Sequence, residues 1–93
     1  MTIPADYNDI LVSAVMPAYN EEATVEAAVR RLREAPLRTE VVCVNDASTD
    51  RTGAILDRLK KEGLVEHVVH HPRNRGKGAA VRTGIQAATG HVI

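Results

Sequence analysis

The feature that most constrains the fold is an alternation of short apolar runs with segments of helical periodicity. Three runs rich in β-branched residues, Ile10–Met16, Val41–Val44 and Val65–Val69, predict strands. Between and after them, apolar residues recur at the spacing of amphipathic helices. These sets are Val25, Ala28, Val29 and Leu32; Thr52, Ile55, Leu56 and Leu59; and Ala80, Val81, Ile85 and Ala88. The alternation predicts an α/β fold with a parallel βαβαβα(β) sheet, in which the final "HVI" begins a fourth strand.

Local signals give the expected helix boundaries. Asn20 is the expected N-cap of the first helix, and Pro36 is expected to end it. Residues 48–50, "STD", offer caps for the second helix. Gly63 and Gly90 stand where a C-terminal glycine would follow the second and third helices.

The composition argues against several classes of function. The 93 residues allow one small domain, and 12 acidic residues balance 12 basic ones, which argues against nucleic-acid binding. Phe and Trp are absent, so stacking platforms for single-stranded nucleic acid are missing. A single cysteine, Cys43, allows no intramolecular disulfide and favours a cytoplasmic location. The sequence shows neither a signal peptide nor an apolar run of the roughly 20 residues that a transmembrane segment needs.

Polar loops follow each of the three predicted strands: "PAYNEE", "NDASTD" and "HPRNRGKG". Ligands of parallel sheets bind at the carboxyl ends of the strands, so these loops are the expected site. Tyr19 offers a flat surface beside a base, and Glu21 an acceptor. Asp46 comes directly off a strand end, where a carboxylate can accept a hydrogen bond from a base N–H or a ribose hydroxyl. The alternative is that these residues serve only as turns and helix caps.

The third loop combines glycines with basic residues. Gly76 and Gly78 let the backbone approach a ligand closely, and Arg75 and Lys77 can face a phosphate at the helix N-terminus. The loop is not a phosphate-binding Walker loop, because the pattern G-x-x-x-x-G-K-[ST] is absent. It is not a dinucleotide fingerprint either, because Val81 stands where a third glycine should be and the loop follows the third strand rather than the first. A solvated basic loop is the alternative interpretation.

Histidine and cysteine are the remaining candidate ligands. His70 and His71 are adjacent, so in a strand they point to opposite faces, and no cysteine or carboxylate lies at metal-ligand spacing. Cys43 is expected to be a small buried residue of the second strand. We therefore expect no metal site from these residues.

Taken together and in order, three stretches closely resemble the N-terminal half of family 2 glycosyltransferases. They are "VSAVMPAYNEEATVEAAVRRL", "EVVCVNDASTDRTGAILDRL" and "HHPRNRGKGAAVRTGIQAATG". The similarity is strongest to dolichyl- and polyprenyl-phosphate mannose and glucose synthases, and it covers residues 10–93. The resemblance implies a GT-A fold and transfer of a sugar from a UDP- or GDP-linked donor to an acceptor, with a polyprenyl phosphate as the suggested acceptor. A lipid-phosphate acceptor would place the protein at the inner face of the membrane.

The resemblance also implies the nucleotide-binding residues. They are Pro17, Ala18, Tyr19, Glu21, Asp46, Asn74, Gly76, Lys77 and Gly78. Three positions depart from the family pattern: Asn45 and Ala47 replace Asp and Gly of an Asp-Asp-Gly-Ser block, and His91 stands where Asp is frequent. From Ala47 we expect a turn that does not require a positive φ.

The family's metal motif, Asp-x-Asp, follows the fourth strand and holds Mg²⁺ or Mn²⁺ on the donor diphosphate. Residues 1–9 are expected to be a tail and residues 10–93 a partial GT-A domain that ends before this motif. The resemblance thus places neither metal ligands nor catalytic residues in the chain, and we expect no transferase activity from these 93 residues alone. We also expect the first strand, flanked by the second and a short fourth, to leave an apolar edge through which the chain self-associates.

Two alternatives stay open at this point. The chain is a non-catalytic remnant that serves as a folding or interaction module, or it is a response-regulator-like or dinucleotide-binding α/β protein. Against the second alternative, the sequence contains neither the acidic cluster of response regulators nor the glycine fingerprint of dinucleotide-binding proteins.

Overall fold

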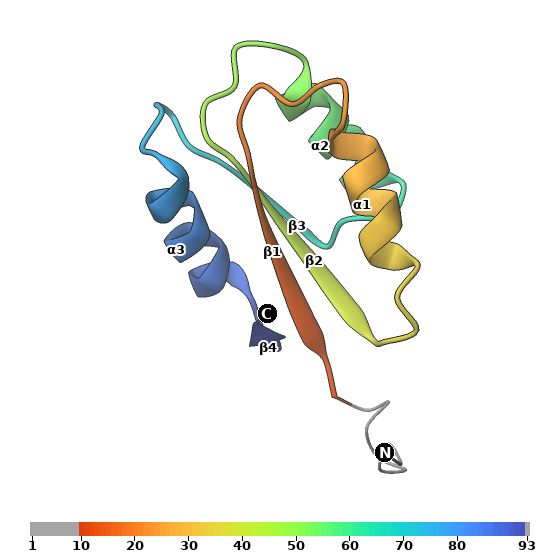
Figure 1. Ribbon diagram of the computed structural model, residues 1–93. Coiled ribbons are helices and arrows are strands. Elements are labelled where there is room, and N and C mark those ends of the chain that lie inside the picture. Colours follow the sequence, from red (N-terminus) through yellow and green to blue (C-terminus); the bar gives the residue numbers. More distant parts are fainter. Residues whose placement is uncertain (1–9, 93) are drawn as a thin grey trace.

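A computed structural model describes residues 10–92, so the expected tail at residues 1–9 lies outside the described residues. Strands and helices alternate along the chain, which confirms the predicted α/β class (Figure 1). The elements are β1 (Val12–Ala18), α1 (Val25–Arg33), β2 (Thr39–Asn45), α2 (Thr52–Lys61), β3 (His67–His70), α3 (Lys77–Ala87) and β4 (His91–Val92).

The strands form one parallel sheet in the order β3-β2-β1-β4, as expected from the resemblance. β1 and β2 pair over their whole length, from Val12 opposite Thr39 to Ala18 opposite Asn45. β4 pairs only with Val12 and Ser13, so the rest of β1 has no partner strand on that side within the described part of the chain. All strands run in the same direction, and the loops after β1, β2 and β3 therefore lie at one end of the sheet.

The helices cover both faces of the sheet, α1 and α2 on one and α3 on the other (Figure 1). The main core lies between the sheet and the helix pair. It contains Ala18, Val25, Val29, Val41, Cys43, Leu56, Leu59 and Val65. Cys43 is fully buried, as expected, and burial raises the pKa of its thiol to about 12. On the opposite face α3 packs closely against β1 at Gly84. Glycine permits this approach, because a Cβ at position 84 would overlap the side chain of Val15.

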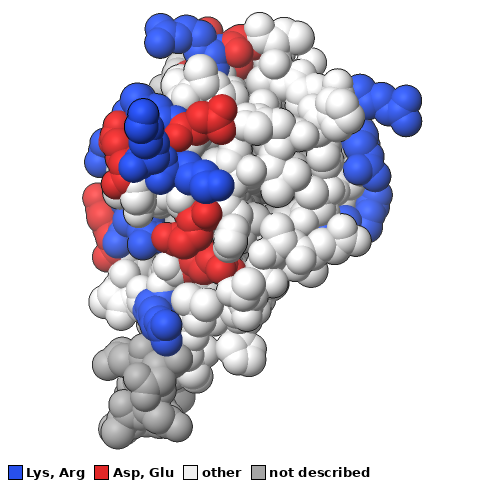
Figure 2. Space-filling view, turned by 180° about the vertical axis from the view of Figure 1, so that it is seen from behind, with Lys and Arg blue, Asp and Glu red and all other residues white. Residues whose placement is uncertain are grey.

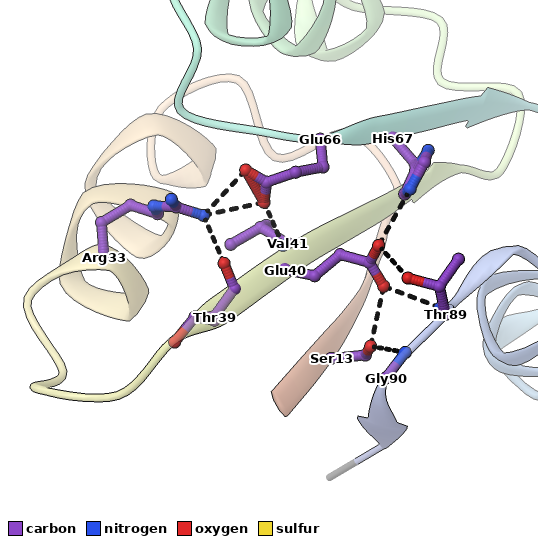
Figure 3. A network of polar contacts seen from close by, with 9 residues as sticks. All are labelled: Ser13, Arg33, Thr39, Glu40, Val41, Glu66, His67, Thr89 and Gly90. Carbon is purple, nitrogen blue, oxygen red and sulfur yellow. Dashed lines mark hydrogen bonds and ion pairs between the residues drawn. The ribbon is translucent and has the colours of Figure 1, made fainter. Parts of the chain in front are cut away.

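The amino ends of the strands are joined by a buried carboxylate, that of Glu40 (Figure 3). Its oxygens accept hydrogen bonds from Ser13 Oγ at 2.7 Å and from the backbone N–H and hydroxyl of Thr89 at 2.8 and 2.7 Å. His67 Nε2 lies 3.1 Å from the same carboxylate. Burial opposes ionisation, but these hydrogen bonds outweigh it and lower the pKa of Glu40 to about 2. Glu40 thus ties the turn after α3 to β1 and β2.

A second carboxylate, that of Glu66, extends the pairing of β2 and β3 (Figure 3). It accepts a hydrogen bond from the backbone N–H of Val41 at 2.6 Å, and Arg33 donates to it at 2.8 Å. Arg33 also donates to the carbonyl of Thr39. The end of α1 is therefore fixed to the start of the sheet.

Two expected helix boundaries are wrong. α1 begins at Val25, and Asn20 is not its N-cap but a turn residue with φ of 50°. Gly90 does not end α3, which stops at Ala87. Gly90 instead lies beside the start of β1, so close that a Cβ at this position would clash with the carbonyl oxygen of Leu11. Gly63 follows α2 with φ of 84°, as predicted.

Candidate functional site

A cleft of about 480 Å³ opens at the carboxyl ends of the strands, between the loops after β1, β2 and β3. The residues that line it come from all three loops and from the first turn of α3. They are Pro17, Ala18, Tyr19, Glu21, Asp46, Asn74, Gly76, Lys77 and Ala80. The sequence pattern predicts polar residues at this end of the sheet, and the structure brings them around one space.

Compared with the residues that the resemblance implies, the lining differs at two positions. Gly78 is the second residue of α3, is exposed, and does not line the cleft. Ala80 lines it instead, further along α3. Its small side chain leaves the cleft room beside the helix.

The first two loops are joined by hydrogen bonds between the side chains of one and the backbone of the other. The N–H of Asn20 donates to Ser48 Oγ at 3.0 Å, and the N–H of Thr49 donates to Asn20 Oδ1 at 2.8 Å. The N–H of Glu22 donates to Asp50 Oδ2 at 3.2 Å. These contacts show that the side chains of Asn20, Ser48 and Asp50 hold the two loops together, and Asp50 also accepts from the N–H of Thr52 at the start of α2.

The turn after β2 corrects one expectation. Ala47 has φ of 61°, so the turn does require a positive φ even though no glycine stands there. The adjacent Asn45 supports the turn, because its Oδ1 accepts a hydrogen bond from the N–H of Ser48 at 3.0 Å. A left-handed alanine costs roughly 1 kcal/mol relative to glycine, and the surrounding hydrogen bonds hold it.

Asp46 lines the cleft, and its carboxylate binds the third loop. Oδ1 accepts from the N–H of Arg75 at 2.9 Å, and Oδ2 accepts from the N–H of Gly76 at 2.9 Å. Asn74 Nδ2 donates to the backbone carbonyl of Asp46 at 3.3 Å. Arg75 therefore contributes its backbone to the site, and its side chain is not among those that line the cleft.

His71 is the polar partner of Asp46 that the sequence analysis missed. It is 7% exposed, and its Nδ1 lies 2.8 Å from Asp46 Oδ1. The hydrogen bond from His71, together with those from Arg75 and Gly76, lowers the pKa of Asp46 against the opposing effect of burial. The alternation of strand faces predicts that the two histidines separate, and His70 indeed faces Asn45 and Asp57. Nothing in the sequence pairs His71 with a carboxylate 25 positions away.

The amino end of α3 supplies the positive side of the cleft. Gly76 precedes the helix with φ of 92°, and Lys77 is the first helical residue. The first N–H groups of a helix point away from it unpaired and attract anions. Residues 67–93 contain four Arg or Lys and no Asp or Glu, and Figure 2 shows cations without acidic neighbours on this edge of the molecule. On the other side, α1 and α2 carry both signs, with ion pairs that join Glu26, Arg30, Arg58 and Glu62.

The cleft thus offers an exposed aromatic ring at Tyr19, a carboxylate at Asp46 and a cation at Lys77. This set suits a ligand with a flat hydrogen-bonding ring and an anionic group. Among residues 10–92 no three His, Cys, Asp or Glu side chains gather closely enough to hold a metal ion. None of the helices described is long and apolar enough to span a bilayer.

Comparison with known proteins gives consistent matches. A sequence model of the family described as "Glycosyl transferase family 2" matches residues 13–93. A dodecaprenyl-phosphate galacturonate synthase from Rhizobium johnstonii is 38% identical over 89 residues, which cover 88% of this chain and 26% of that protein. The chain spans only 20% to 30% of the length of the curated relatives that it matches.

Solved structures of similar fold agree with the sequence matches. The mannosyltransferase PcManGT from Pyrobaculum calidifontis, in complex with GDP-Man and Mn²⁺, is 31% identical with a TM-score of 0.76, over 85% of this chain and 24% of that one. S. aureus TarS 1-349 in complex with UDP is 26% identical with a TM-score of 0.79, over 90% of this chain and 26% of that one.

Proposed function

The chain belongs to glycosyltransferase family 2, and on that premise we propose that residues 10–93 form the nucleotide-binding part of a GT-A domain. The observation that carries this proposal is the cleft itself. Every residue that the resemblance assigned to nucleotide binding, except Gly78, lines a single space at the carboxyl ends of the strands. This is where parallel α/β sheets bind their ligands.

The cleft chemistry matches the parts of a nucleotide. Tyr19 presents a half-exposed ring for a base to stack against, and Asp46 presents an acceptor for a base N–H or a ribose hydroxyl. Lys77 and the N-terminus of α3 provide the positive charge that a diphosphate needs. The aromatic and cationic groups lie on different loops, so a nucleoside diphosphate would bridge the loops after β1 and β3.

The donor that we propose is a UDP- or GDP-linked sugar. The two similar structures were solved with GDP-Man and with UDP, which supports both nucleotides as candidates. The name of the relative from Rhizobium johnstonii supports a polyprenyl phosphate as the acceptor class. Transfer of the sugar is a property that we propose for a protein of the relatives' length, and nucleotide binding is what we propose for these residues.

One of the similar structures contains a metal ion. PcManGT was solved with Mn²⁺, and a divalent cation on the donor diphosphate would stabilise the leaving group. Among residues 10–92 no cluster of ligating side chains fits such an ion. We therefore assign no metal ligand and no step of the transfer to these residues.

Binding of UDP and GDP, measured by calorimetry and by NMR titration, tests the proposal. The chain is expected to bind at least one of them with a dissociation constant no weaker than millimolar, and Asp46→Ala to weaken that binding about tenfold. Glu34→Gln, an exposed substitution at the end of α1, serves as the matched control that leaves binding unchanged. Absence of binding at millimolar nucleotide would refute the proposal and favour a non-catalytic module.

A further inference from the structure

His71 is a buried polar residue that does not line the cleft, yet it connects three segments that shape it. It follows β3 directly, and its N–H donates to the carbonyl of Asn45 at 2.9 Å, which extends the sheet by one residue. Nδ1 lies 2.8 Å from Asp46 Oδ1, in the loop after β2. Nε2 lies 2.8 Å from Thr83 Oγ1, on the inner side of α3. The ring therefore joins β3, the loop after β2 and α3.

The chemistry of these partners fixes the tautomer of the neutral ring. An ionised carboxylate only accepts hydrogen bonds, so Nδ1–H of His71 must donate to Asp46. In the neutral ring Nε2 then accepts the hydroxyl hydrogen of Thr83. Both ring nitrogens are satisfied in this tautomer, so the ring is fixed in orientation.

The fixed ring in turn restricts Asp46. Two donors, His71 Nδ1 and the N–H of Arg75, occupy Oδ1, while Oδ2 receives only the N–H of Gly76. A carboxylate oxygen can accept about two hydrogen bonds, so the remaining capacity lies on Oδ2. Without His71, only the N–H groups of Arg75 and Gly76 would hold the carboxylate, so its orientation and the closure of the loop would be less firmly fixed.

We propose that His71 is a positioning residue for nucleotide binding, which acts through Asp46: it fixes the carboxylate so that Oδ2 is presented to the nucleoside while the loop before α3 stays closed. This inference rests on the proposed function, because it assigns the free acceptor of Asp46 to the bound nucleotide. His71 itself touches no ligand in this arrangement, since it is outside the lining of the cleft.

Three substitutions at position 71 separate positioning from general support of the fold. In His71→Asn the side-chain amide stands where Nδ1 stands, so the donor to Asp46 is retained and the contact with Thr83 is lost. In His71→Gln the amide reaches toward Thr83, and the donor to Asp46 is lost. His71→Ala removes both. The matched control is Thr83→Val, which leaves His71 and Asp46 paired but removes the hydroxyl.

Two measurements are made on every variant. Nucleotide affinity is expected to fall about tenfold in His71→Gln and His71→Ala, the size expected from loss of a charge-assisted hydrogen bond, and to stay within about threefold of the original in His71→Asn and Thr83→Val. Amide hydrogen exchange without nucleotide is expected to show Arg75 and Gly76 protected in the original chain, His71→Asn and Thr83→Val, and faster exchange by about tenfold in the other two. Circular dichroism reports whether each variant is folded.

The outcomes are distinguishable from failure of the proposed function. If the original chain binds neither nucleotide but the exchange pattern follows position 71 as expected, the proposed function fails while the control of the loop by His71 is supported. If His71→Asn loses as much affinity and protection as His71→Ala, or if Thr83→Val loses as much as His71→Gln, the proposal is overturned.

Discussion

Asp46 Oδ2 accepts a hydrogen bond from the backbone N–H of Gly76 at 2.9 Å, across 30 positions of the sequence. This contact places the residue before α3 beside the end of β2. It helps to fix the start of α3, where Lys77 lines the cleft. A single carboxylate thus sets the loop before Lys77 relative to the end of β2.

Lys77→Ala is expected to distinguish a diphosphate from a nucleoside. The substitution removes one cation at the helix N-terminus and is expected to weaken UDP binding about tenfold, while uridine binding, followed by NMR titration, stays the same. Lys61→Ala, at the far end of α2, is the control and should leave both affinities unchanged. Equal losses for UDP and uridine in Lys77→Ala would contradict the assignment of Lys77 to the phosphates.

Ala47→Gly is expected to stabilise the chain. Ala47 adopts φ of 61°, which disfavours any residue with a Cβ, so glycine should raise the free energy of unfolding by up to about 1 kcal/mol despite its greater freedom when unfolded. Ala54→Gly, on an exposed position of α2, provides the opposite control, with a loss of about 1 kcal/mol. Urea denaturation measures both. A loss of stability in Ala47→Gly would show that the left-handed turn is not strained.

Glu40 is expected to make the fold sensitive to acid. Its pKa is about 2 in the folded chain against an ordinary value of 4.5, so its contribution to stability is complete well above pH 4.5 and is lost as the pH falls toward 2. That contribution amounts to about 3 kcal/mol at most, because a tenfold change in proton affinity corresponds to roughly 1.4 kcal/mol. Glu40→Gln should therefore be destabilised at neutral pH and should lose less further stability than the original chain between about pH 5 and pH 2.

Urea denaturation at several pH values measures this difference. Glu34→Gln replaces an exposed carboxylate at the end of α1 and should follow the pH dependence of the original chain. If Glu40→Gln and the original chain lose stability in parallel on acidification, Glu40 does not carry the expected linkage.

Within residues 10–92 β1 has an open edge beyond Ser13, and this edge is expected to pair with a second copy of the chain. β4 covers only Val12 and Ser13, and beside the open part of the edge lies an apolar groove of about 350 Å³. Its lining comes from β1 and from one side of α1: Ala14, Val15, Met16, Ala28, Arg31 and Leu32. Unpaired strand edges with apolar neighbours associate with other strands.

Adjacent substitutions on α1 test this edge. Ala28→Glu places a charge in the groove and is expected to keep the chain monomeric in sedimentation equilibrium, whereas the original chain gains mass with concentration. Ala27→Glu, on the exposed side of the same helix, should behave like the original chain. A mass that stays monomeric at every concentration in the original chain would contradict the prediction.

Element order, sheet direction and the location of the cleft could be predicted from the sequence, because each depends on local periodicity and on where strands end. The three apolar runs predict parallel strands, and the loops that follow them carry Tyr19, Asp46 and Lys77. These residues are therefore expected at one end of the sheet, where the structure places them. The family resemblance then selected residues within those loops.

What could not be predicted depends on contacts between distant parts of the chain. Asn20 has the residue type of a helix cap, but its side chain holds Thr49, 29 positions away. Gly90 has the residue type of a helix end, but it is small because β1 passes beside it. Ala47 gives no sign of strain in the sequence, because residue type alone does not reveal a φ that neighbouring hydrogen bonds impose. His71 carries no local signal of its pairing with Asp46.

The hydrogen bonds between the first two loops also determine which positions around the cleft can be substituted without disturbing it. Asn20, Ser48 and Asp50 hold backbone groups of the opposite loop, so replacing them would alter the scaffold itself. Tyr19 and Lys77 face the cleft, and within the described part of the chain neither side chain makes a hydrogen bond. If the proposed nucleotide site is right, substitutions at these two positions can therefore change which ligand the cleft prefers without altering the hydrogen bonds that hold the loops.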